Sequence, residues 1–283
     1  MDIVAIVASA LMALLSPTGM VLDSVATDAL RQQVVSADAL VVRIDNVPNH
    51  QILNGRIDQA RVAARGIYPR QLPGLRIAAI DLETDSVAVD LGALRQGQIK
   101  LNAPAQAALR LRIQADDINA FLASPQVQAW LDTLQFDLPG VSDRVQRRYG
   151  LANPTLAFLD GDRFRLVVDL EDQVLAETIP ITLETGVRVI DGHRIEVVEP
   201  RLEVEGVEFP PELVLSFAEG ASQEFSLRRL EDQGLTARIL AFTVRNNELD
   251  IAIFARLDPD SPFLQSGASA PPTEPPGPPL GQP

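Results

Sequence analysis

Residues 101–134 read LNAPAQAALRLRIQADDINAFLASPQVQAWLDTL, and along this stretch the apolar period changes from two to about 3.6. Between Leu101 and Ile113 every odd position is apolar, while polar residues such as Arg110 and Arg112 take even positions. This alternation predicts a strand with one buried face. At about 3.3 Å per residue the strand would extend for roughly 45 Å. The sheet to which it belongs is therefore expected to be long.

The second half of the stretch has helical spacing. Asp116 is a candidate N-cap for a short helix over residues 117–123, and Ser124 followed by Pro125 is typical of the start of a second helix. Apolar residues three or four positions apart are Ile118, Phe121 and Leu122 in the first helix and Val127, Trp130, Leu131 and Leu134 in the second. The pattern fits helices packed on a sheet, or a sheet and helices that enclose a ligand. In the second case Trp130 faces the long sheet and is partly exposed to a groove.

Composition limits the classes of function. The 283 residues are 46% hydrophobic, which is ample for a core, and 38 acidic against 24 basic residues give a net charge of -14. That charge repels a phosphate backbone, so a nucleic-acid partner is not expected. The sequence has no cysteine, which excludes disulfides, thiolate metal sites and a cysteine nucleophile.

The N-terminal segment, residues 1–35, is predicted to be apolar or amphipathic helix. Ile3 to Leu22 carries no charge, and its dense part ends at Leu15. This run fits a signal-peptide core, a membrane anchor, or a helix packed on the rest of the protein. The first two readings place the protein at the cell envelope or in the periplasm, and the third leaves a peripheral cytoplasmic location open.

Further alternating segments indicate more strands. They cover residues 40–44, 55–67, 75–91, 164–170, 179–189, 235–244 and 249–257, with phase slips between Ile57 and Ala60 and between Leu82 and Val87. Asp191-Gly192 is a type I′ hairpin signal, and Asn246-Asn247 is predicted to join the last two strands. Short helices are predicted from Ser142 and over 210–218. We therefore expect an α+β architecture ordered as sheet, helices, sheet, in a single domain over 36–257. The segment 258–283 has nine prolines and is predicted to be a disordered tail.

Catalytic motifs are missing from the sequence. It has no GxSxG elbow, no GxxxxGK[ST] loop, no GxGxxG after a strand and no HExxH. His50 and His193 lie in predicted turns, and Asp116-Asp117 is better explained by helix capping than by acid-base chemistry. We therefore predict no catalytic residue, no metal ligand and no cofactor.

Arg144, Arg147 and Arg148 form a basic cluster on the predicted helix that begins at Ser142. Guanidinium groups suit phosphate, so the cluster is a candidate contact for an anionic headgroup. The alternative is stabilisation of a helix C-terminus by its cations.

A longer stretch, residues 52–125, resembles the LmeA-like phospholipid-binding domain, long catalogued as a domain of unknown function, and in particular its cyanobacterial members. The matching features are Gly55 opening a strand, the region from Arg65 to Tyr68, the restart at Gly74-Leu75, a hairpin over Asp90 to Gly97, and the strand that ends in Asp116-Asp117-Ile118-Asn119. The resemblance covers residues 20–135 well and 150–257 loosely.

This resemblance implies a tubular lipid-binding fold, in which a long, curved antiparallel sheet wraps one or more helices and leaves an apolar groove. The implied ligand is a phospholipid or another acyl-chain lipid, and the implied partner is a membrane surface. Groove residues predicted on this basis are Leu109, Leu111, Ile113, Phe121, Leu122, Val127, Trp130 and Leu134. The expected function is binding or transfer of lipid without catalysis, in membrane or cell-envelope maintenance. The alternative is a structural or interaction module of the envelope with a packed interior.

Overall fold

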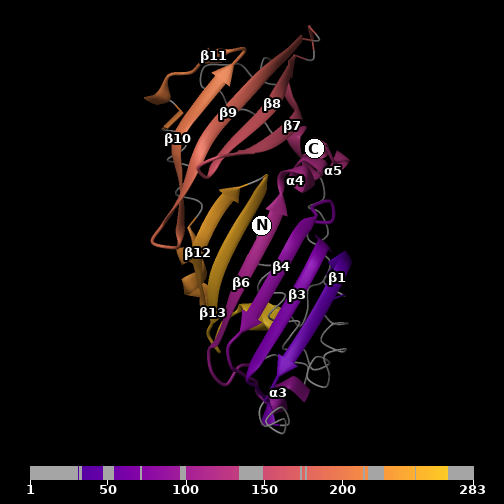
Figure 1. Ribbon diagram of the computed structural model, residues 1–283, viewed down its shortest axis with the longest axis vertical. Coiled ribbons are helices and arrows are strands. Elements are labelled where there is room, and N and C mark those ends of the chain that lie inside the picture. Colours follow the sequence, from indigo (N-terminus) through magenta and orange to yellow (C-terminus); the bar gives the residue numbers. More distant parts are fainter. Residues whose placement is uncertain are drawn as a thin grey trace, which may run out of the picture.

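The strands of the protein form two main antiparallel sheets, one above the other in Figure 1. The computed structural model describes residues 31, 34–46, 54–70, 72–95, 100–133, 149–172, 174–175, 177–212, 214–215, 226–245 and 247–266. Leu134, most of the predicted N-terminal segment, most of the helix predicted from Ser142 and the tail beyond residue 266 lie outside these described residues. Where these predicted segments overlap the described residues, Val34 and Val35 belong to a strand, as do Tyr149 and Gly150, and Phe263–Ser266 form a short helix. None of the helices within them is both long and apolar enough to cross a bilayer.

The first sheet has six strands, and its order does not follow the chain. The order is β1 (Val34–Asp45), β3 (Gln59–Pro69), β4 (Ile77–Thr84), β6 (Ala105–Gln114), β13 (Glu248–Leu257) and β12 (Leu235–Arg245). The last hairpin of the chain thus returns to pair with β6, with Ile253 opposite Leu109 and Ile251 opposite Leu111. The strands of the second sheet therefore lie between β6 and β12 in the sequence.

Alternation on β6 produces the buried face that the sequence predicted. Ala105, Ala107, Leu109, Leu111 and Ile113 are all buried. Apart from the buried Thr84 beside Ala107, their partners on the neighbouring strands, such as Leu82 beside Leu109, are apolar as well, so the first sheet has a mainly apolar inner face. At the lower end this face is fully covered, where Leu264 of α8 (Phe263–Ser266) is buried in the same cluster.

The second sheet has five strands in the order β11 (Val207–Glu208), β10 (Arg194–Val204), β9 (Glu177–Ile190), β8 (Arg163–Asp172) and β7 (Tyr149–Leu159). Consecutive strands are neighbours, so this sheet is a simple meander. At the β9–β10 turn Asp191 and Gly192 both have positive φ, as the predicted type I′ turn requires. The family resemblance implied one long curved sheet, whereas these strands are divided between two main sheets.

Two helices follow β6 and lie beside the junction of the sheets, α4 (Ala115–Leu122) and α5 (Pro125–Leu131) (Figure 1). Ser124 caps α5 and Pro125 is in its first turn, as predicted. The prediction for α4 was wrong at its cap. Gln114 occupies the N-cap without a side-chain hydrogen bond, and Asp116 lies in the first turn, because the helix begins directly where the strand stops.

Three segments differ from their predicted boundaries. The strand predicted from Leu101 begins at Ala105, and Leu101 itself forms an isolated bridge with Val89. The two phase slips mark the ends of strands: β2 (Arg56–Ile57) and β5 (Val87–Ala88) leave the large sheet and pair with each other.

The predicted hairpin over Asp90 to Gly97 was also wrong in its first half. This part is α3 (Leu91–Arg95), at whose start the Asp90 carboxylate accepts hydrogen bonds from the amides of Gly92 (2.7 Å) and Ala93 (3.1 Å). The N–H groups of Ala93 and Gly92 lower the pKa of Asp90. A capping aspartate therefore starts a helix where the sequence suggested a turn.

Asn119 of α4 ties the helices to the second sheet. Its Nδ2 donates to the carbonyl of Leu156 (2.9 Å), and its Oδ1 accepts from the amide of Leu156 (2.7 Å). β7 is an edge strand, so these backbone groups lack a neighbouring strand on that side. The side-chain amide of Asn119 therefore makes the two hydrogen bonds to Leu156 that a neighbouring strand would otherwise make.

We predict that Asn119→Ala destabilises the protein by about 1–3 kcal/mol, because two backbone groups of Leu156 lose their partner. Urea unfolding measures the loss. Asn102→Ala, at an exposed position of a loop, is the control and should change stability by less than about 0.5 kcal/mol. Equal stabilities for the two variants would contradict the bridging role of Asn119.

Candidate lipid-binding surface

One face of the second sheet is apolar over its whole width. The strand register places Leu166 opposite Leu183, Val168 opposite Ile181 and Leu170 opposite Ile179. On β10 and β7 the same register adds more residues to this face, which in total carries Leu151, Leu156, Phe158, Phe164, Leu166, Val168, Leu170, Ile179, Ile181, Leu183, Leu202 and Val204. The other face is mainly polar and acidic, with Asp169, Glu171, Glu184 and Glu203. The sheet is amphipathic, as the alternation in its strands dictates.

This apolar face is covered less completely than the core of the first sheet. In the described part of the second sheet no leucine, isoleucine, valine or phenylalanine is fully buried, whereas Leu109 and Leu111 of the first sheet are. The main helix contacts of the second sheet are those of α4 and α5 with its edge strand β7. The apolar side chains of this face are half-buried, and a broad apolar face that is only half-buried is a candidate binding surface.

Three phenylalanines join the apolar faces of the two sheets. The ring of Phe164 is 5.5 Å from that of Phe158 in an edge-on arrangement and 6.1 Å from that of Phe242. Phe242 lies on β12 opposite Ile251, which pairs with Leu111 on the inner face of the first sheet. The two apolar faces therefore form one surface, which we call the joined apolar surface.

The predicted groove residues divide between the core and the surface. Leu109, Leu111 and Ile113 belong to the inner face of the first sheet and are buried, as is Val127 of α5. Phe121 and Leu122 are partly exposed.

Trp130 was expected to face the long sheet and to be partly exposed to a groove. Trp130 is 58% exposed, because α5 buries Val127 and Leu131 and turns Trp130 outward. Leu134 and the headgroup candidates Arg144, Arg147 and Arg148 lie outside the described residues.

The apolar face of the second sheet was missed as a candidate site. Alternation predicted β8 and β9 but not β7 or β10. Nothing in that pattern distinguishes a face that is well covered from one that is not. The available signal was the succession of strands from Phe164 to Val189 without a predicted helix between them to cover the apolar positions.

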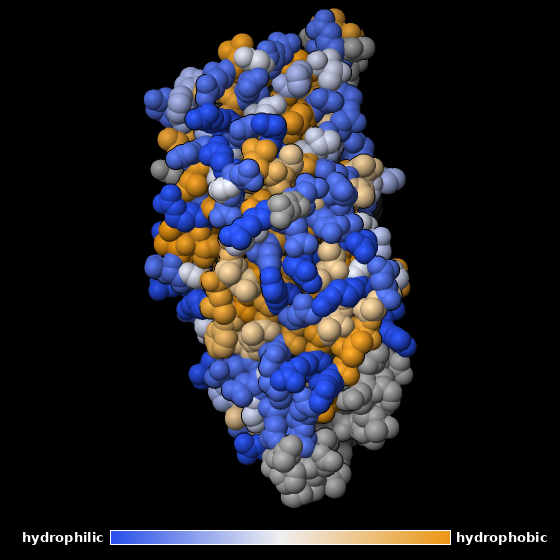
Figure 2. All heavy atoms as spheres, in the orientation of Figure 1, coloured by the Kyte–Doolittle hydropathy of each residue, from blue (hydrophilic) through white to orange (hydrophobic). Residues whose placement is uncertain are grey.

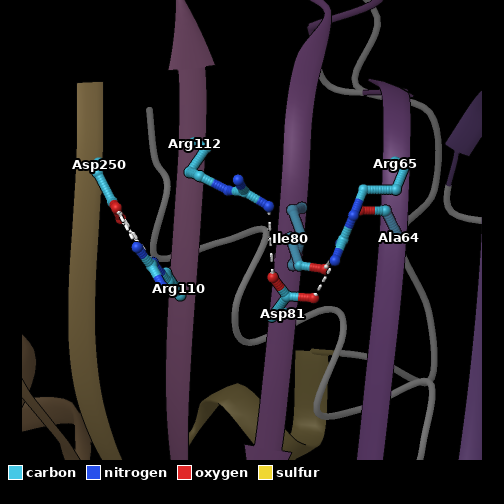
Figure 3. A network of polar contacts seen from close by, with 7 residues as sticks. All are labelled: Ala64, Arg65, Ile80, Asp81, Arg110, Arg112 and Asp250. Atoms are coloured by element: carbon cyan, nitrogen blue, oxygen red, sulfur yellow. Dashed lines mark hydrogen bonds and ion pairs between the residues drawn. The ribbon is translucent and has the colours of Figure 1, made fainter. Parts of the chain in front are cut away.

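The outer face of the first sheet has the opposite character. Figure 3 shows Arg110 of β6 pointing at Asp250 of β13, and Arg65 and Arg112 converging on Asp81 of β4. An open pocket of about 790 Å³ lies on this face, and its lining includes Arg110, Asp116, Thr243, Arg245, Glu248 and Asp250. Such a lining is unsuited to acyl chains. Figure 2 shows blue side chains across the middle of the molecule with orange patches above and below.

The described residues contain no cluster of three or more histidine, cysteine, aspartate or glutamate side chains that could hold a metal ion. His193 lies at the β9–β10 turn, where its Nδ1 is 3.1 Å from the carbonyl oxygen of Asp191.

A family model described as LmeA-like phospholipid-binding matches residues 14–254. The chain belongs to this family. Neither a curated protein nor a solved structure matches the chain significantly. Membership of the LmeA-like family suggests lipid as the class of ligand.

The Arg110–Asp250 pair makes stability depend on pH. Nε of Arg110 donates to Oδ1 (2.9 Å) and Oδ2 (3.1 Å) of Asp250, and this hydrogen bonding lowers the pKa of Asp250. A lowered pKa in the folded state means that the pair contributes stability above the unfolded pKa of about 4. This stability is lost as the pH falls through the folded pKa.

We predict that Asp250→Asn lowers the thermal midpoint at pH 7, and that the difference from the unsubstituted protein shrinks as the pH falls below about 4. Thermal scans at a series of pH values measure this. The control is Glu248→Gln, on the same strand and in the same pocket. A difference for Asp250→Asn that persists unchanged in acid would contradict this account.

Proposed function

We propose that this protein binds phospholipid without catalysis, with the acyl chains on the joined apolar surface, and that it carries or presents this lipid at a membrane or in the cell envelope. The observation that carries the proposal is the contact of Phe164 with Phe242, which makes the two apolar faces continuous. Family membership supports the ligand class. In this proposal the second sheet and the upper part of the first correspond to the sheet of a tubular lipid-binding fold.

The energetics are sufficient for binding. Each methylene that leaves water contributes about 0.8 kcal/mol, so a chain of about 16 carbons has a gross driving force near 13 kcal/mol. Part of this is lost to ordering of the chain and to incomplete coverage on an open surface. The remaining free energy is enough to hold a lipid reversibly, which is what transfer requires.

A second candidate function is an interaction module with a packed interior. It is favoured by the burial of Leu109, Leu111 and Ile113, which were predicted to line a groove and lie in the core. In that case the apolar face of the second sheet would bind a protein. Lipid content distinguishes the two functions.

We expect native mass spectrometry of the purified protein to show bound phospholipid, and organic extraction to release it. Val168→Asn, on the apolar face, should reduce the bound fraction severalfold, because a polar amide meets the acyl chain there. Val167→Asn is the matched control, since its neighbouring position points to the opposite face beside Thr182. Equal lipid content in the two variants, or no lipid in the unsubstituted protein, would overturn the proposal.

A further inference from the structure

The apolar face of the second sheet continues to the end of the sheet furthest from α3 (Figure 1). On β11, Val207 lies opposite Val204, and the amide of Phe209 donates to the carbonyl of Leu202 (2.8 Å). The register therefore places Val207 and Phe209 on the apolar face. Both are exposed, Val207 by 67%. Coverage of the face thus decreases toward its outer edge.

The β8–β9 turn adds two exposed apolar residues at the same end. Val174 is 71% exposed and Leu175 is 58% exposed. Their amides donate to Oδ1 of Asp172, at 2.9 and 3.1 Å, and the Asp172 side chain is itself buried. The turn is thus held in a conformation that presents both side chains to solvent. We call Val174, Leu175, Val207 and Phe209 the apolar tip.

The surroundings of the apolar tip are acidic. Between residues 169 and 180 and between 201 and 212 the sequence has eight acidic residues and one basic residue, Arg201. Glu203 and Glu208 face each other on the polar side of β10 and β11. A negatively charged bilayer would repel this end of the sheet over roughly a Debye length, about 10 Å at 0.1 M salt. A bilayer of zwitterionic phospholipid would not.

We infer that the apolar tip docks on phospholipid bilayers of low negative surface charge, and that lipid moves from there along the apolar face of the second sheet. This inference rests on the proposed function and adds where the membrane is met and which membrane is preferred. Val207 and Phe209 of the tip continue the apolar face, which supports a bilayer as the partner, because an acyl chain leaving the bilayer there stays in contact with apolar side chains.

The test uses the full chain and vesicles of phosphatidylcholine that carry a small fraction of fluorescent phosphatidylcholine. The tip variant combines Val174→Ser, Leu175→Ser and Val207→Ser. The control variant combines Val35→Ser, Val41→Ser and Leu240→Ser, which are the same residue types at 61%, 61% and 65% exposure on the first sheet. Vesicle flotation and lipid transfer should fall roughly tenfold or more for the tip variant. The control variant should behave like the unsubstituted protein.

Charge preference is tested with vesicles that contain phosphatidylglycerol. We expect weaker docking than on pure phosphatidylcholine at low salt, and a smaller difference at high salt. Stronger docking on the anionic vesicles, or equal transfer by the tip and control variants, would overturn the inference.

A short-chain phosphatidylcholine below its micelle concentration separates this inference from the proposed function. The unsubstituted protein and the tip variant should bind it equally, since most of the apolar face is unchanged. If neither binds it, the proposed function fails. If both bind it and the tip variant still docks and transfers normally, only the inference fails. Binding of a basic protein by the apolar tip, without binding of vesicles, would also overturn the inference.

Discussion

The antiparallel pairing of β6 with β13 is the interaction on which the rest of the structure depends. It brings Leu257 opposite Ala105 and Glu248 opposite Gln114, so that segments about 140 residues apart in the sequence lie side by side. Without this pairing β6 would be an edge strand, and Leu109 and Leu111 would lose their apolar neighbours on one side. The pairing also forces the second sheet to leave the first after β6 and return to it at β12.

This topology explains why the two apolar faces meet. β12 carries Phe242 on the inner face of the first sheet, and the strands that precede it in the chain carry Phe158 and Phe164. The amide of Val244 on β12 donates to Oδ1 of Asp162 at the β7–β8 turn (2.7 Å), which fixes the position of one sheet on the other. A covered core at one end and an open apolar face at the other follow from the same pairing. The first end supplies stability, and we propose that the second supplies the lipid site.

Local features of the fold could be predicted from the sequence, and its long-range features could not. Alternation identified most of the strands, though not β7 or β10, and Ser124-Pro125 identified the start of α5. Both signals depend on neighbouring residues. The placement of the last hairpin beside β6 left no local signal, since an apolar strand pairs equally well with several others. The same applies to the candidate site. Periodicity placed Val168 and Leu183 each on the apolar side of its own strand. Whether the face that these strands share is covered is decided by distant segments. The apolar stripe of α5 was too short to show that Trp130, and not Val127 or Leu131, turns outward.

The central claim is that phospholipid acyl chains lie on the joined apolar surface. Photo-crosslinking with a phosphatidylcholine that carries a diazirine in its acyl chain tests this most directly, because peptide mapping then locates the chain. The account predicts crosslinks at Phe164, Val168 and Ile181. Crosslinks confined to the polar face around Val167 and Thr182, or to the pocket beside Arg110 and Asp250, would contradict it.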